Sequence, residues 1–517
     1  MKGVWQMTTA SEKLAQSLEV LHLLQSKGVT AVKSGDLTRT HRERLIKAGF
    51  IKEVIKGWYI PSRPDETAGE STAWYTLFWS FCAQYLAARF GEDWSLSPEQ
   101  SLKLHAGDTT VPLQLLVRAS KAGNMKTEFP HKTSIFETRA TFAQGNTLVI
   151  REQLRLFSVE EALILVPENF FRQNATDART ILAMMPDASA LLARLLEGGH
   201  TRAAGRLTGG FRSIGNTRIA EEIVAAMKSA SYDLRETDPF DETVTLRGSG
   251  RETSPHVHRI RLKWAALRET VVAHFSAAEP VANDADSYLN AMDAIYVTDA
   301  YHSLSIEGYQ VSPALIEKVR GGGWNADGDR QDRAMKNALA ARGYWEAFQN
   351  VRESVRAVLG GENVAEVVER DLTGWYRALF APSVGAGLLQ ASQLAGYRNA
   401  PVYIRGSQHV PMSVEAVRDC MPVFFELLRA ETDPAVRVVL GHFIFVYIHP
   451  FIDGNGRIAR FLMNVMLAAA GHPWTVIKVE NRAAYMAALE AASVQEDILP
   501  FAKFLAEALG AGIETAR

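Results

Sequence analysis

Two apolar segments near the C-terminus enclose a short string that carries two glycines and several charged side chains. The segments are residues 438–448 (VVLGHFIFVYI) and 460–470 (RFLMNVMLAAA), and the string between them is HPFIDGNGRIAR, residues 449–460. Apolar residues recur at the 3.6-residue spacing of an α-helix on both sides, which predicts helices over 434–447 and 456–470. This part of the chain is therefore expected to be a pair of packed helices joined by a tight, glycine-containing loop.

The rest of the C-terminal half follows the same helical pattern. Apolar spacing of the helical type predicts further helices over 262–275, 297–305, 333–351, 365–379, 414–429 and 483–492. The exception is residues 402–411, where Val-Tyr-Ile precedes the turn Arg-Gly-Ser and predicts a short β-hairpin. We expect an all-α domain with one hairpin.

The N-terminal segment has a different pattern. Helical spacing over 11–26 is followed by a short helix over 37–48, which carries four cations, and then by period-2 residues around Lys56-Gly57 that predict a tight hairpin. This order is that of a winged helix-turn-helix, which we assign to residues 1–65. The cations are Arg39, Arg42, Arg44 and Lys47. They are either a solvated helix face or contacts to DNA phosphates, and the sequence leaves both open.

Strand-like and helical segments continue to about residue 230. With the basic helix, the KGWYIP hairpin and the helix at SPEQSLKLH, they resemble the AbiEi-type antitoxin and regulator family. The resemblance implies an α+β, partly helical module over 66–230. A polar, turn-rich stretch over 231–255 predicts a linker, which leaves 256–517 as the helical half.

Composition narrows the class of protein. Hydrophobic residues make up 47% and charged residues 22% of the 517 residues, which is typical of a folded globular protein of several domains. The net charge of -2 argues against a globally basic nucleic-acid protein, and two cysteines exclude a disulfide framework. The apolar run 438–451 is shorter than the ~20 residues that cross a bilayer. We expect a cytoplasmic protein with no membrane partner.

The chemistry concentrates in the string 449–460. Gly454, Asn455 and Gly456 open a helix, and backbone N–H groups at a helix N-terminus bind phosphate. Arg457 and Arg460 can add charge-assisted contacts to a polyphosphate. Asp453 is a hard oxygen donor suited to Mg²⁺ that takes its other ligands from phosphates, and His449 can accept a proton near pH 7.

The ordered pattern H-P-F-x-D-G-N-G-R-x-x-R resembles the signature of the Fic (Fido) family at every defined position. The resemblance implies a protein adenylyltransferase that moves AMP from ATP to a Ser, Thr or Tyr hydroxyl, with His449 as the general base and Mg²⁺ on Asp453. It further implies a Fic core over about 365–500.

Two further segments resemble parts of the same family. Val402, Tyr403, Ile404, Arg405 and Gly406 match the flap hairpin that holds the target segment by strand addition. Tyr485, in RAAYMAAL, matches the helix beside the nucleotide base. Met486 and Ser493 stand where the family carries tyrosine and asparagine, so the identity of the nucleotide stays open.

Residues Ser303 to Gly308 (SLSIEG) match the inhibitory helix of the family, here expected over 297–308. Taken alone, Ser303 and Glu307 before Gly308 are equally consistent with an ordinary capped helix end. The resemblance implies that Glu307 pairs with Arg460 and occupies the place of the γ-phosphate.

Several alternatives remain at the level of the sequence. The same site could transfer UMP, phosphate or phosphocholine, or remove AMP by hydrolysis with Glu307 aligning a water. The chain could instead be a DNA-binding regulator with a nucleotide-sensing Fic half. The target, another protein or the chain itself, is not specified, and neither is the oligomeric state, a homodimer included.

Overall fold

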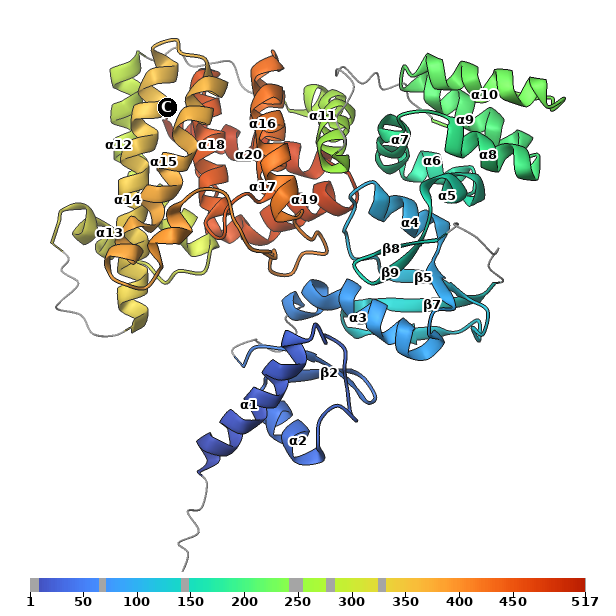
Figure 1. Ribbon diagram of the computed structural model, residues 1–517. Coiled ribbons are helices and arrows are strands. Elements are labelled where there is room, and N and C mark those ends of the chain that lie inside the picture. Colours follow the sequence, from blue (N-terminus) through green and yellow to red (C-terminus); the bar gives the residue numbers. More distant parts are fainter. Residues whose placement is uncertain are drawn as a thin grey trace, which may run out of the picture. The chain divides into compact units, whose positions relative to one another are not determined.

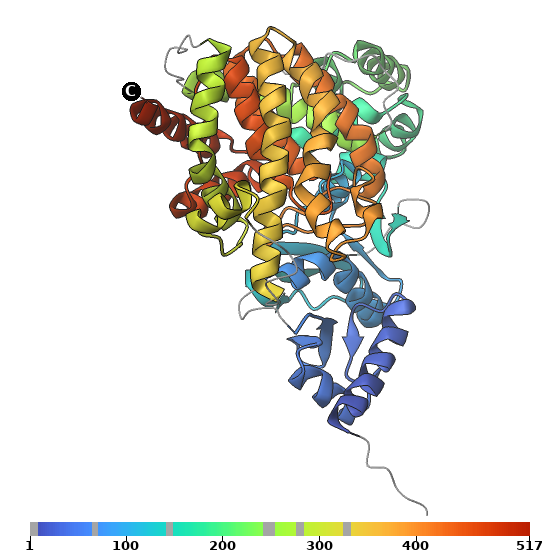
Figure 2. The ribbon, with the colours of Figure 1, turned by 90° about the vertical axis from the view of Figure 1, so that its left-hand side faces the viewer.

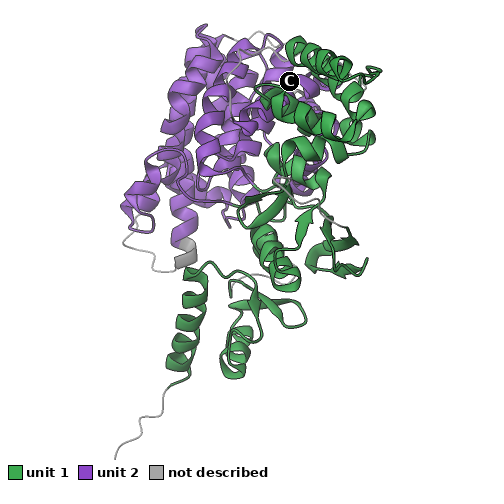
Figure 3. Ribbon diagram, turned by 45° about the vertical axis from the view of Figure 1, so that its right-hand side comes forward, with its two compact units in different colours: residues 1–245, 403–410 green, residues 246–402, 411–517 purple. Residues whose placement is uncertain are grey.

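The computed structural model describes residues 9–64, 71–140, 148–240, 254–275, 284–323 and 332–516. The chain divides into two compact units (Figure 3): unit 1 holds residues 1–245 and 403–410, and unit 2 holds residues 246–402 and 411–517. The division falls within the segment 231–255 that the sequence predicts as a linker, of which residues 241–253 lie outside the described residues.

The first part of unit 1 has the predicted order of elements: α1 (Ala10–Ser26), β1 (Val32–Lys33), α2 (Arg39–Lys47), β2 (Ile51–Ile55) and β3 (Trp58–Pro61). The strands form an antiparallel sheet in the order β1-β3-β2, and Gly57 makes the β2–β3 turn with φ +84°. Helix α2 begins two residues later than expected because the Thr38 side chain accepts the His41 N–H as an N-cap. The predicted hairpin around Gly57 is confirmed.

A second sheet and a helical layer complete unit 1. The sheet has the order β4-β5-β7-β6, in which β5 and β7 are parallel, and α3 (Thr72–Phe90) packs on it through aromatic side chains. Its strands are β4 (Trp94–Leu96), β5 (Gln114–Ala119), β6 (Lys126–Glu128) and β7 (Ser134–Arg139), followed by the pair β8 (Leu148–Arg151) and β9 (Leu154–Phe157). The helices are α4 (Pro98–His105), α5 (Val159–Leu165), α6 (Asn169–Gln173), α7 (Ala175–Met184), α8 (Ser189–Gly198), α9 (Thr201–Ser213) and α10 (Thr217–Ser229).

The described residues of unit 2 form helices and no β-strand. The helices are α11 (Pro255–His274), α12 (Ala285–Ile306), α13 (Pro313–Arg320), α14 (Asp332–Leu359), α15 (Val364–Gly385), α16 (Val414–Ala430), α17 (Pro434–Ile448), α18 (Asn455–Ala469), α19 (Arg482–Val494) and α20 (Leu499–Ala516). Figures 1 and 2 show the long helix α14, in yellow, running beside α12 and α15.

Helices α17 and α18 form the centre of unit 2. Almost every side chain of both is buried, since apolar residues surround each helix on all sides. The two helices predicted from the apolar segments are thus confirmed, and the loop between them lies at the end of the buried pair. None of the described helices combines the length and hydropathy that crossing a bilayer requires.

The hairpin expected at 402–411 is not formed. Residues 401–404 and 408–413 have no strand pairing, although a turn is present at Arg405-Gly406. The backbone oxygens available for a hairpin are used elsewhere in unit 1: Gln408 O accepts the Val111 N–H at 3.0 Å, and Val410 O accepts the Thr109 hydroxyl at 2.9 Å. Tertiary partners have therefore replaced the local strand pair.

Candidate active site

The loop between α17 and α18 begins with a strained residue. His449 ends α17 in the left-handed region, with φ +54°, which is costly for a residue other than glycine. The buried guanidinium of Arg398 stabilises this turn: its Nε donates to His449 O at 2.9 Å, and its backbone N–H donates to Pro450 O at 2.8 Å. Arg398 also donates to the carbonyl of Met412, so it joins both ends of the segment 398–412 to the loop. The sequence shows no signal for this role, since a single arginine in a polar stretch is ordinary.

Asn455 closes the loop from the other side. Its side chain is buried and bonds the Phe451 backbone twice, accepting from N–H at 2.9 Å and donating to the carbonyl at 2.8 Å. Phe451 stacks on Tyr376 with ring centroids 4.1 Å apart. The Asn455 amide therefore holds the loop, which leaves the backbone N–H of Asn455 for the phosphate site predicted at Gly454, Asn455 and Gly456.

The N-terminus of α18 requires glycine at two positions. Gly454 has φ +78°, and a Cβ there would lie 2.9 Å from Phe380. A Cβ on Gly456 would overlap the carboxylate of Glu307. The first N–H groups of a helix have no partner within the helix, so α18 presents donors and a positive dipole end at this point.

Arg457 lies at the first turn of α18 and is almost fully buried. Its guanidinium carbon is 5.0 Å from the Phe380 ring centroid and 5.2 Å from that of Tyr309, so two rings sandwich it. Its Nη2 is 3.8 Å from Asp453 Oδ2. Its Nε has no hydrogen-bond partner among the described residues. A buried donor of this kind is expected to serve a ligand.

Arg460 meets the end of α12, one turn further along α18. Its Nε donates to Ser303 Oγ at 2.8 Å, and its Nη2 donates to Ser303 O at 3.0 Å and to Glu307 Oε1 at 2.8 Å. Burial alone would lower the pKa of Arg460, but the Glu307 carboxylate outweighs it and holds the pKa above the usual range. The structure thus brings together Ser303, Glu307 and Arg460, as the sequence predicts.

Helix α12 differs from its predicted extent. It begins at Ala285, twelve residues before the expected start at 297, because Asp284 provides an N-cap for a longer apolar pattern. It ends at Ile306, and Gly308 follows in the left-handed conformation, φ +87°. Arg482 of α19 donates to Ile306 O at 2.7 Å, which fixes the helix end that carries Glu307.

The proton state of His449 follows from its surroundings. Its Nδ1 lies 3.3 Å from Val446 O, which can only accept, so Nδ1 carries the proton and Nε2 keeps its lone pair. Burial lowers the pKa of His449 to about 4. The imidazole is therefore neutral at pH 7 and able to accept a proton.

Asp453 is the exposed carboxylate of the loop, with 66% of its side chain accessible. Oδ1 accepts the Gly454 N–H at 2.6 Å, and Oδ2 lies 3.8 Å from Arg457 Nη2. The described residues hold no cluster of three or more metal-binding side chains. A single carboxylate fits Mg²⁺ that takes most of its ligands from phosphates and water, but not an all-protein site.

Tyr485, which the resemblance places beside the nucleotide base, lies on α19. It is buried, and its hydroxyl is 2.8 Å from Nε2 of His442, which is also fully buried. Burial raises the pKa of Tyr485 to about 12 and lowers that of His442 to about 3. The Tyr485 hydroxyl is therefore bonded within the core of unit 2, and the nucleotide contact stays a prediction.

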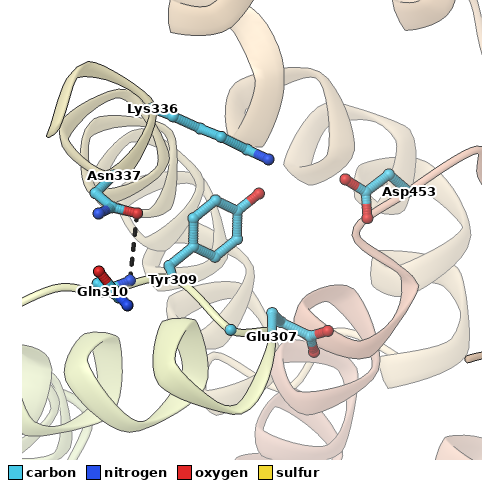
Figure 4. A pocket seen from close by; sticks show the side chains of 7 residues that line it. Glu307, Tyr309, Gln310, Lys336, Asn337 and Asp453 are labelled. Carbon is cyan, nitrogen blue, oxygen red and sulfur yellow. Dashed lines mark hydrogen bonds between the residues drawn. The ribbon is translucent and has the colours of Figure 1, made fainter. Parts of the chain in front are cut away.

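A cavity of about 380 Å³ lies between Glu307 and Asp453 and the start of α14 (Figure 4). Its lining is Glu307, Gly308, Tyr309, Gln310, Lys336, Asn337 and Asp453. Glu307, Gly308 and Asp453 were expected from the motifs. The other lining residues were not, because they belong to no local pattern and reach the site only through folding: Tyr309, Gln310, Lys336 and Asn337.

The remaining candidates lie in unit 1, except Val402 of the flap segment, which belongs to unit 2. In the flap segment, Tyr403 is exposed, at 38% of its surface, and Arg405 is exposed as well. In α2, Arg42 and Arg44 donate to backbone carbonyls of the β1–α2 turn and of α1, at 2.7 Å each. These two arginines hold the fold. Arg39 pairs with Glu43 at the surface, and Lys47 is exposed.

Residues 368–467 match the family model described as the Fic/DOC family. This segment is therefore similar to Fic domains. It contains the loop, α17 and most of α15 and α18, whereas the inhibitory segment at Glu307 precedes it.

Curated relatives extend the likeness beyond the domain. The "Protein adenylyltransferase Fic" of Culex quinquefasciatus is 29% identical over 236 residues, covering 43% of this chain and 44% of the relative. The protein of the same name from Drosophila willistoni is 30% identical over 236 residues, covering 45% of this chain and 44% of the relative. "Protein adenylyltransferase fic-1" of Caenorhabditis elegans is 27% identical over 240 residues, with 43% and 41% covered. The chain therefore spans less than half the length of these relatives.

Solved structures give weaker matches. "Fic-1 (aa134 - 508)" from C. elegans has a TM-score of 0.37 at 18% identity, covering 69% of this chain and 90% of that one. A Fic domain containing signaling protein from Bacteroides thetaiotaomicron has a TM-score of 0.34 at 20% identity, covering 49% and 92%.

Proposed function

We propose that the chain is an autoinhibited protein adenylyltransferase that transfers AMP from ATP to a Ser, Thr or Tyr hydroxyl of a protein target or of itself. The observation that carries the proposal is the loop of the Fic domain: a neutral His449 stands beside a helix N-terminus whose two arginines include buried donors without partners, Arg457 Nε and Arg460 Nη1, among the described residues. Such a set can bind a polyphosphate and remove a hydroxyl proton.

In the proposed reaction, the triphosphate lies on the N–H groups that begin α18, and Arg457 and Arg460 neutralise its outer phosphates. His449 Nε2 takes the proton of the target hydroxyl as that oxygen attacks the α-phosphorus. The new O–P bond forms as the bond to the β-phosphate oxygen breaks, and its electron pair leaves with pyrophosphate. Positioning and electrostatic stabilisation supply most of the rate.

Asp453 is the residue that would hold Mg²⁺, which would neutralise charge on the phosphates when bound. Its partly free carboxylate suits that task, while the Gly454 N–H fixes its orientation.

Autoinhibition rests on the pairing of Glu307 with Arg460. The carboxylate stands where an outer phosphate oxygen would bind, and it lies over the first turn of α18, so it opposes a triphosphate by charge and by volume. In this state, ATP is expected to bind in a pose that exposes the α-phosphorus poorly.

The direct test is the intact mass of the protein after incubation with ATP and Mg²⁺, with peptide mapping of any added AMP. Addition of one AMP mass to the Glu307→Gly protein, and none to the same protein with His449→Ala, supports the proposal. UTP and CDP-choline in parallel incubations test the other transferred groups. Release of AMP from a modified protein would instead indicate hydrolysis.

For the N-terminal part, we propose a winged helix that binds DNA. The α1–β1–α2–β2–β3 order with its three-stranded sheet supports this role. The four predicted cations remain the candidates for phosphate contacts. Lys47 is exposed and Arg39 is paired with Glu43 at the surface, whereas Arg42 and Arg44 also donate within the fold.

The segment 402–406 is proposed as the docking site for the target. Its backbone forms no helix or strand, and the side chain of Tyr403 is exposed. A target segment could therefore pair with this backbone and cover Tyr403.

A further inference from the structure

One wall of the cavity comes from helix α14 and from the chain that follows α12, outside the segment that matches the Fic/DOC family. Among the described residues that line this cavity, Lys336 is the only cation. Figure 4 shows its side chain extending past the Tyr309 ring towards Asp453. No ion pair joins Lys336 to either of the lining carboxylates, Glu307 and Asp453. Its ammonium group is therefore not neutralised by the cavity itself.

Specific contacts hold this wall in place. The Gln310 N–H donates to Asn337 Oδ1 at 3.2 Å, which ties the residues after α12 to α14. Two cations lie near the ring of Tyr309, next to Gln310: the Arg457 guanidinium carbon is 5.2 Å and Lys336 Nζ is 5.9 Å from its centroid. The ring attracts both cations through its π-electrons.

This arrangement gathers positive charge that the protein leaves only partly compensated. Arg457 and Arg460 already lie at the start of α18, and each has a buried donor without a partner among the described residues. Like charges gathered around one site repel each other, and an anion that binds between them lowers this repulsion. A ligand with several negative oxygens would satisfy the buried donors and the exposed ammonium together.

We propose that Lys336 binds the outer phosphates of the nucleotide and then the pyrophosphate that leaves. This inference rests on the proposed function and adds to it a residue that no motif contains. When the bond between the α-phosphorus and the bridging oxygen breaks, its electron pair stays on the pyrophosphate oxygen. The ammonium of Lys336 stabilises that negative charge, while the proton of the attacking hydroxyl goes to His449. Lys336 thus acts on the leaving group, on the side of the cavity opposite the α18 N-terminus.

The test uses the full chain with Glu307→Gly as the parent. Lys336→Ala removes the charge, Lys336→Arg keeps it, and Lys318→Ala is the matched control, an exposed lysine of α13 that does not line the cavity. Calorimetry measures the binding of inorganic pyrophosphate, of ATP and of AMP. We expect Lys336→Ala to weaken pyrophosphate and ATP binding about tenfold and to leave AMP binding unchanged, with Lys336→Arg and Lys318→Ala close to the parent.

Equal pyrophosphate affinity of Lys336→Ala and the parent would overturn the inference, as would an equal loss for AMP or no pyrophosphate binding by the parent. Because these measurements need no turnover, they decide the role of Lys336 even if no AMP is transferred. Conversely, AMP transfer with no effect of Lys336→Ala on pyrophosphate binding would leave the proposed function intact and remove only Lys336 from it.

Discussion

Replacing Glu307 with glycine is expected to activate the protein strongly. In the structure, Glu307 Oε1 accepts from Arg460 Nη2 at 2.8 Å, and the Arg460 side chain is only 5% exposed. A hydrogen bond between charged groups contributes about 1.5–3 kcal/mol, which corresponds to roughly 10–100-fold in the competition for Arg460. The Glu307 carboxylate lies so close to Gly456 that a Cβ on this glycine would overlap it. Removing the carboxylate therefore also frees the space next to Gly456.

The gain in rate is expected to exceed the gain in affinity. An outer phosphate displaced by about 1 Å can cost ~10²-fold in rate, and the released arginine would restore its position. The Glu307→Gly variant should therefore transfer AMP at least ~10²-fold faster than the natural chain. Glu307→Gln is the matched control: it keeps the size of the side chain and one oxygen acceptor but not the charge, so it should activate only partly.

Radiolabelled ATP transfer by four proteins provides the assay: the natural chain, Glu307→Gly, Arg460→Ala and the double variant. The double variant should lose the gain, because the freed arginine is what orients the outer phosphate. Equal activity of the natural chain and Glu307→Gly would refute the reasoning and reduce the contact to an ordinary helix end. Full activity of the double variant would show that Arg460 is not the group that Glu307 blocks.

Other variants test the remaining assignments. His449→Ala in the activated protein should lower the transfer rate by about 10²–10⁴ and leave ATP binding nearly unchanged; a rate equal to that of the parent would exclude His449 as the base. Because burial lowers the pKa of His449 to about 4, the imidazole stays neutral well below pH 6.5, and the pH–rate profile should reach half its maximum near pH 4 on the acid side, whereas a midpoint at 6.5 would contradict the assigned environment. Asn455→Ala removes two hydrogen bonds to the Phe451 backbone and should lower the free energy of unfolding in denaturant by about 1–3 kcal/mol. An unchanged denaturation midpoint would show that these bonds do not stabilise the loop. Replacing both Arg39 and Lys47 by alanine should weaken DNA binding and flatten its salt dependence, as measured by fluorescence anisotropy. If the natural chain showed no DNA binding even at low salt, the cations of α2 would be solvent-facing charges and not DNA contacts.

Much of the candidate site was predictable because its chemistry is local. The loop residues from His449 to Arg460 stand in one continuous string, and helix periodicity alone places them between two buried helices. The segment ending at Glu307 carried a weaker signal, since a glutamate before a glycine is common at helix ends. Its contact with Arg460, 153 residues away in sequence, appears only when α12 packs against α18.

Local sequence therefore determined the type of the elements and the chemistry of the loop: periodicity specifies a helix, and left-handed turns favour glycine, as at Gly454 and Gly57. Tertiary structure decided which polar groups are still available for function. It assigned the Asn455 amide to the Phe451 backbone, buried Tyr485 against His442, and replaced the expected hairpin at 402–411 with bonds to Thr109 and Val111. Most buried polar groups need a partner within the fold, and packing between distant segments decides which partner each one meets, which no local pattern encodes.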